Sequence, residues 1–117
     1  MSLETVLTPL LETVCDEVSP DFADFNTPRP YVTYQQIGGQ DVIPLDSSLP
    51  GTLNAEVQIN VWADTRLEAS ALMLAIRSLL IQSTGVTARP LAAAQNDFDA
   101  DIPVYGSRQD FTIWYTA

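Results

Sequence analysis

The stretch that decides the fold is Thr52–Ala63, TLNAEVQINVWA, which is followed after Asp64 and Thr65 by RLEASALMLAIRSLLIQ at 66–82. In its first part, apolar and polar residues alternate, which indicates a β-strand with one buried and one polar face. Such a strand suits an antiparallel sheet that is covered on one side. Trp62 is the exception on the polar face. We expect it to pack under a loop or against another subunit, where aromatic residues are enriched.

The second part predicts a long central helix from about Arg66 to Gln82. Thr65 and Glu68 match a capping box at its start, and Gly85 can end it in the left-handed conformation. Projected at about 100° per residue, its apolar residues cover roughly two thirds of the circumference. A helix that lies on a sheet needs a stripe only somewhat wider than about 100°. Another helix or a neighbouring subunit must therefore cover the excess.

The narrow polar arc of this helix holds Arg66, Ser70, Met73 and Arg77. Arginines on such an arc usually face solvent. In an oligomer they can reach acids of the next subunit, because the planar guanidinium binds carboxylates in a bidentate way. Together with Trp62, these four residues are the candidates for a subunit interface.

Upstream of this unit, apolar residues spaced by three and four from Leu3 to Val18 predict an N-terminal helix, which is either kinked at Pro9 or begins near it. Cys15 lies near the edge of this stripe and is expected in the core. The proline-rich residues 19–30 predict a loop insert. Two strands are expected before the central one, at 31–37 and, as a short return strand, at 41–45.

Downstream of the helix, residues 86–94 predict an edge strand, because Pro90 lacks the N–H that an inner strand needs. Residues 95–102 predict an acidic loop, and a hairpin follows that turns around Gly106 and Ser107, with strands at 102–105 and 109–116. We therefore expect residues 1–117 to form a single α+β domain. We expect an antiparallel sheet of four to five strands, with the N-terminal helix and the long central helix packed mainly on one face.

The charge of the chain excludes several function classes. It has 15 acids and 5 bases, a net charge of −10, and no histidine. All five bases are arginines, so lysine-based and imidazole-based catalysis and the usual zinc ligands are excluded. A net charge of this sign disfavours nonspecific DNA binding. No apolar run approaches the roughly 20 residues of a membrane span, and we expect a non-catalytic protein without a cofactor.

The acidic triplet Asp97, Asp99 and Asp101 copies the first half of a calcium loop. The second half does not match. Ile102 stands where the loop needs glycine, and Arg108 stands where it needs a bidentate glutamate. A solvated acidic loop is the ordinary interpretation of this triplet.

Three segments together resemble the tail completion family of tailed bacteriophages and prophages. They are VQINVWADTRLEA at 57–69, the helix that ends IRSLL at 76–80, and RQDFTIWY at 108–115, preceded by PYVTY at 30–34. The resemblance spans about residues 3–117 and brings no catalytic residue. It implies a virion protein, made in the bacterial cytoplasm, that forms a ring, typically a hexamer, at the head-proximal end of the tail.

In that place the family implies a tail tube protein and a head connector or stopper as partners. The ring ends tube polymerisation and joins tail to head, while DNA passes through without sequence-specific binding. An acidic lumen that includes Asp97, Asp99 and Asp101 fits this passage, because negative potential keeps DNA from sticking. The alternative is a small acidic binding or inhibitor domain that binds calcium through residues 97–101.

Overall fold

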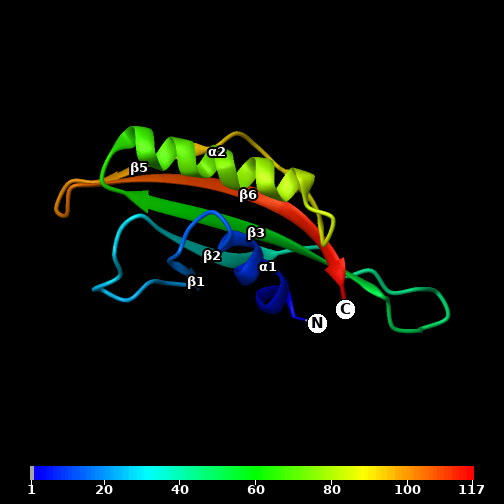
Figure 1. The fold of residues 1–117 in the computed structure, drawn as a ribbon. Coiled ribbons are helices and arrows are strands. Elements are labelled where there is room, and N and C mark those ends of the chain that lie inside the picture. Colours follow the sequence, from blue (N-terminus) through cyan, green and yellow to red (C-terminus); the bar gives the residue numbers. More distant parts are fainter. Residues whose placement is uncertain (1) are drawn as a thin grey trace.

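The computed structural model describes residues 2–117, and in it two helices lie on one face of a six-stranded sheet (Figure 1). The elements are α1 (Leu3–Leu11), β1 (Val18–Pro20), β2 (Tyr31–Gly38), β3 (Thr52–Ala63), α2 (Arg66–Gln82), β4 (Thr87–Pro90), β5 (Gln95–Asp99) and β6 (Val104–Thr116). The mixed α and β content and the strand at 52–63 are as the sequence predicts.

The sheet has the strand order β1-β2-β3-β6-β4, and β5 also pairs with β6. β3 and β6 pair over their whole shared length, from Thr52 opposite Thr116 to Ala63 opposite Tyr105. The outer edge of β6 is divided between β5, at its first half, and β4, at its second half. Because β1 runs parallel to β2, the sheet is mixed, and the prediction of a purely antiparallel sheet of four to five strands is wrong. Three-residue β1 is too short to carry the alternation by which strands are recognised.

α1 differs from the prediction in its C-terminal bound, and α2 differs in how its C-terminus is capped. α1 begins at the N-cap Ser2, includes Pro9, and ends at Leu11 rather than at Val18. α2 has the predicted bounds, and the Thr65 hydroxyl accepts a hydrogen bond from the Glu68 amide at its start. It ends because Ser83 is extended, without a left-handed glycine. Its 17 residues span about 25 Å, which is half of the 53 Å long axis of the molecule. The prediction of a long central helix is therefore wrong.

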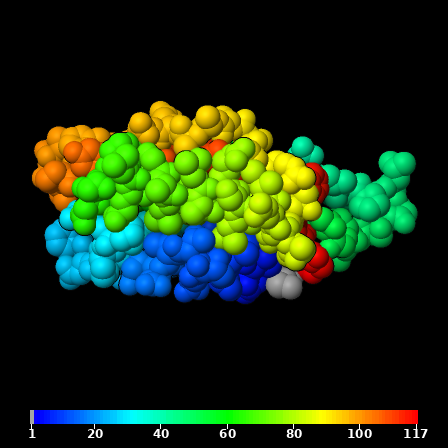
Figure 2. Space-filling model, turned by 45° about the horizontal axis from the view of Figure 1, so that its top comes forward, coloured from blue at the N-terminus to red at the C-terminus, as the bar shows by residue number. Residues whose placement is uncertain are grey.

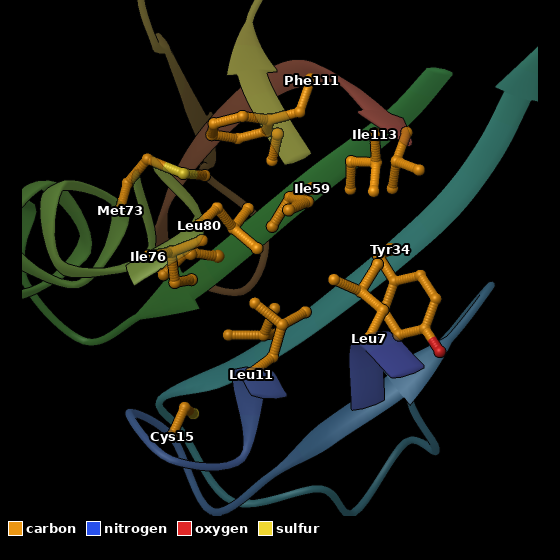
Figure 3. Close-up of a cluster of buried hydrophobic side chains, with 14 of the residues drawn as sticks. Leu7, Leu11, Cys15, Tyr34, Ile59, Met73, Ile76, Leu80, Phe111 and Ile113 are labelled. Carbon is orange, nitrogen blue, oxygen red and sulfur yellow. The ribbon is translucent and has the colours of Figure 1, made fainter. Parts of the chain in front are cut away.

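The core lies between the two helices and the alternating apolar positions of the sheet (Figure 3). α1 contributes Leu3, Leu7 and Leu11, and α2 contributes Ala69, Met73, Ile76 and Leu80. The central strands contribute Val57, Ile59, Val61, Phe111 and Ile113, all without exposed surface. The opposite face of the two central strands carries mostly polar, partly exposed side chains, with Trp62 and Trp114 as exceptions. The predicted one-sided covering is confirmed.

β6 corrects the predicted C-terminal hairpin. The expected turn at Gly106 and Ser107 lies inside one continuous 13-residue strand. Trp62 explains why a glycine stands inside this strand, because a Cβ on Gly106 would lie 2.8 Å from the indole ring. The glycine therefore makes room for a cross-strand neighbour and does not mark a turn. The true hairpin partner is β5, which lies within the predicted acidic loop 95–102.

Two loop regions occupy opposite ends of the long axis (Figures 1 and 2). At one end, the connection from Gly39 to Gly51 between β2 and β3 projects beyond the body of the protein, and the short strand expected at 41–45 is part of this loop. At the other end lie the predicted insert at 19–30 and the turn between β5 and β6. The candidate site is built from these ends and from the exposed side of α2.

Candidate functional site

The exposed side of α2 is apolar. Leu67 is 83% exposed and Leu74 is 62% exposed, and Ala71 lies between them on the same side. These residues are spaced by four and three, so they form one stripe along the helix. α1 packs at the β1–β2 side of the sheet and does not cover this stripe. The apolar surface of the helix that the sequence predicts to need cover is therefore exposed to solvent in the single chain. That a neighbouring subunit covers it stays a prediction.

Three residues of the predicted polar arc, Ser70, Met73 and Arg77, line one groove. Met73 is 1% exposed and packs in the core, so it is not the exposed residue that the sequence predicts. The helix is turned so that Met73 faces the sheet while Leu74, predicted on the apolar side, faces outward. Ser70 and Arg77 do lie together, at a groove beside Leu74.

Arg66 is held within the chain. Its guanidinium donates to the backbone carbonyl of Gly106 at 2.6 Å and to that of Asp97 at 2.7 Å. It also lies 5.4 Å from the centre of the Tyr105 ring, within the range of a cation–π contact. The first turn of α2 is thereby fastened to both strands of the β5–β6 hairpin. We name this set of contacts the Arg66 clamp.

The groove beside α2 has a volume of about 300 Å³. One wall is α2, with Ser70, Leu74 and Arg77, and the other is the segment that leads into β5, with Ala93 and Ala94. Figure 2 shows this exposed side of α2 with that segment above it. The residues that line the groove include one base and no acid, although acids outnumber bases threefold in the chain.

Arg77 makes no ion pair within the chain. Among residues 2–117 the one salt bridge joins Arg29 Nε to Asp64 Oδ1 at 2.7 Å. Arg77 is exposed and also donates no side-chain hydrogen bond in this part of the chain. It is therefore a charge that a partner can still neutralise.

A second hollow, of about 630 Å³, lies at the end of the molecule that carries the 19–30 insert. Trp62 and Tyr31, which are paired across β2 and β3, form its floor with the insert beside them. Trp62 thus lies under a loop, one of the two positions expected for it. Asp24, Asp99 and Arg29 line the same hollow, so its acids outnumber its bases. The Arg29–Asp64 ion pair, which sequence reasoning missed, fastens the insert to the end of β3.

The acidic triplet is spread over two kinds of structure. Asp97 and Asp99 belong to β5, and Asp101 follows in the turn, where its amide donates to Asp99 Oδ1 at 3.0 Å. A calcium loop wraps its ligands around the ion, which an extended strand does not do. Within residues 2–117 no three His, Cys, Asp or Glu side chains are placed to hold a metal ion together.

Two buried groups have shifted pKa values. Burial raises the pKa of the Cys15 thiol above its ordinary 9.0, and burial also raises the pKa of Tyr34 above 10.0, although its hydroxyl is hydrogen bonded to Thr8. Both shifts favour the neutral form. Cys15 lies in the core, as expected, and its neutral thiol is a packing group.

The projecting loop is the feature that sequence reasoning missed. Leu45 and Leu49 are fully or almost fully exposed at 107% and 93%. The signal was available, because apolar residues stand at 42, 43, 45 and 49 in a segment whose prolines, glycines and serines prevent a strand. Apolar side chains without a strand to bury them indicate a contact outside the chain.

The family model named "Tail completion protein gp17" matches residues 4–116. The chain belongs to this family. Among solved structures, one whose title names no function matches at 14% identity with a TM-score of 0.52, over 94% of this chain and 89% of that chain. This likeness shows a shared fold. No curated protein matches the chain significantly.

As a tail completion protein, the chain has a role in the assembly of bacteriophage tails, and its place is the tail of the virion. Its partners are therefore tail-related. Neither helix in residues 2–117 is long and apolar enough to cross a membrane.

Proposed function

We propose that this tail completion protein forms a ring at the head-proximal end of the tail, where it ends polymerisation of the tail tube and joins the tail to the head. The partners are other copies of the chain, the tail tube protein, and a head connector or stopper. DNA passes through the ring without sequence-specific binding. The role is structural and involves no catalysis.

The observation that carries the proposal is the two-sided apolar character of α2. Met73 and Ile76 face the core, while Leu67 and Leu74 face solvent. A helix that is apolar on both sides must be buried on both sides. Within the single chain, the sheet buries only the side that carries Met73 and Ile76. A ring provides the second cover at every position, because each subunit offers the same surface to its neighbour.

The charge of the chain agrees with a DNA channel. Six copies at −10 each carry −60, so a ring of six has a strong negative field. Such a field keeps a DNA backbone from adhering to the wall. The same charge opposes assembly, and contacts between apolar surfaces must outweigh it.

Mass photometry of the purified chain tests ring formation. A single oligomer of closed stoichiometry is expected. Because repulsion between acidic chains is screened beyond a Debye length, association strengthens from about 0.05 M to about 0.5 M salt. Leu74→Ser weakens it, whereas Ile37→Ser, a single change of the same kind on β2, leaves it unchanged. A chain that stays monomeric at both salt concentrations contradicts the proposal.

A further inference from the structure

The tip of the projecting loop is a β-turn with an apolar and an acidic residue at its centre. Ser47 donates its amide proton to the Pro44 carbonyl at 3.0 Å, which closes the turn around Leu45 and Asp46. The Ser48 amide donates to Asp46 Oδ1 at 3.0 Å. One oxygen of the Asp46 carboxylate is therefore bound within the turn, whereas the Leu45 side chain is fully exposed.

The base of the loop is held against the sheet. The buried side chain of Asn54 accepts from the Gln40 amide at 2.8 Å and donates to Thr112 at 2.9 Å. Gly39 has φ +146°, and a Cβ there would lie 2.6 Å from the Asn54 carbonyl oxygen. The loop therefore leaves β2 in a defined direction. A segment ordered in advance loses less entropy when it binds.

The groove beside α2 complements this tip in shape and in charge. Its volume of about 300 Å³ has room for a leucine side chain, and Leu74 and the alanines at 93 and 94 supply apolar walls. Arg77 at its rim has no ion pair within residues 2–117, and Asp46 has a carboxylate whose pKa is lowered by hydrogen bonds from Ser48. An apolar anchor in a pocket with a charged rim is the usual arrangement at the centre of an interface.

We propose that the Leu45–Asp46 tip of one copy inserts into the α2 groove of the next, with Leu45 beside Leu74 and Asp46 paired with Arg77. This rests on the proposed ring and names its contact. The tip lies at one end of the molecule and the groove along its side (Figure 2). Such a contact joins two different surfaces, so repetition closes a ring or extends a filament and does not stop at a dimer.

The other hollow of the protein is the poorer receptor for the tip. Asp24, Asp99 and Arg29 line it, and the Arg29 guanidinium is already paired with Asp64. The carboxylate of Asp46 would therefore meet two carboxylates there and no unpaired base. Like charges placed together at an interface oppose binding. In the groove beside α2, the one charged lining residue is Arg77, which attracts a carboxylate.

Cysteine cross-linking tests which surfaces meet. A disulfide requires Cα atoms within about 7 Å, and native Cys15 is buried. A mixture of Leu45→Cys and Leu74→Cys chains is expected to give covalent heterodimers under mild oxidation, and a chain with both changes gives a ladder up to the closed ring. Neither single variant forms dimers by itself. Dimers of Leu45→Cys alone would mean that two tips meet, which overturns the proposal.

Charge exchange tests the ion pair. Arg77→Asp and Asp46→Arg each weaken association about tenfold or more, and the two together restore it. Arg89→Asp and Asp41→Arg are the matched controls, because they change the net charge equally at positions outside the tip and the groove. Leu45→Ser weakens association about ten- to a hundredfold, as expected for the loss of one buried leucine. If Arg77→Asp and Asp46→Arg weaken association no more than Arg89→Asp and Asp41→Arg do, the proposal is overturned.

The outcomes separate this contact from the ring itself. If closed rings form, no cross-link between 45 and 74 appears, and charge exchange has no effect, the tip contact is wrong and the ring stands. If the unaltered chain does not associate under any salt condition, both are wrong.

Discussion

Replacement of Met73 by alanine, compared with the same replacement of Leu74, tests the orientation of α2. Met73 is 1% exposed and points towards Phe111 in the core (Figure 3), whereas Leu74 is 62% exposed. Truncation of a buried methionine costs about 2–5 kcal/mol, since transfer energy is lost and a cavity remains. Truncation of Leu74 changes the free energy of unfolding by about 0.5 kcal/mol or less, because alanine is an equally good helix former.

Chemical and thermal unfolding measure both changes, at low protein concentration so that association does not add apparent stability. The unfolding entropy of a domain of this size is about 0.25 kcal/mol/K, so each kcal/mol shifts Tm by about 4 °C. We expect Met73→Ala to lower Tm by about 8–20 °C, and Leu74→Ala to shift it by about 2 °C or less. Equal shifts, or a larger one for Leu74→Ala, would refute the orientation and with it the open apolar stripe.

Three further predictions concern the clamp, the sheet and pH. Arg66→Ala is expected to lower the free energy of unfolding by about 1–3 kcal/mol, because three charge-assisted hydrogen bonds are lost. Hydrogen exchange should then speed up in the β5–β6 hairpin before other strands. Gly106→Ala is expected to destabilise the protein by about 1–3 kcal/mol, because its Cβ meets Trp62; tryptophan fluorescence should shift, and an unchanged Tm would contradict the packing. Folding raises the pKa values of Cys15 and Tyr34 above their ordinary values of 9.0 and 10.0. The contribution of these two groups to the free energy of unfolding is therefore complete below those ordinary values and is lost as pH rises through the pKa values of the folded protein. Tm should therefore fall above about pH 9, and Cys15→Ala with Tyr34→Phe should flatten that fall.

The sequence predicted the central strand and helix well, because the strand alternates over 12 residues and the 17-residue helix begins at a capping box. It failed where a neighbour decides the local structure. Gly106 looks like a turn residue until Trp62 is seen to occupy its face. β1 exists because β2 offers it a partner, and nothing in its three residues predicts that.

The candidate site was predicted only in part, and the rotation of α2 explains the errors. When apolar residues surround most of a helix, periodicity cannot say which part of the circumference faces the sheet. For this reason Met73, expected on the exposed polar arc, is buried, and Leu74, expected on the apolar side, is exposed. The sequence predicted Arg66 on the polar arc, as a candidate for the subunit interface. Its partners within the chain are the Asn96 side chain and two backbone carbonyls 31 and 40 residues away, which no sequence pattern marks.

The most direct test of the central claim is electron microscopy of tail tubes polymerised with and without this chain, using the tail tube protein of the same phage. We expect ring density at one end of each tube and no further growth from that end when more tube protein is added. Tubes that continue to grow at both ends, or density of the chain along the tube wall, would contradict the proposed role at the head-proximal end.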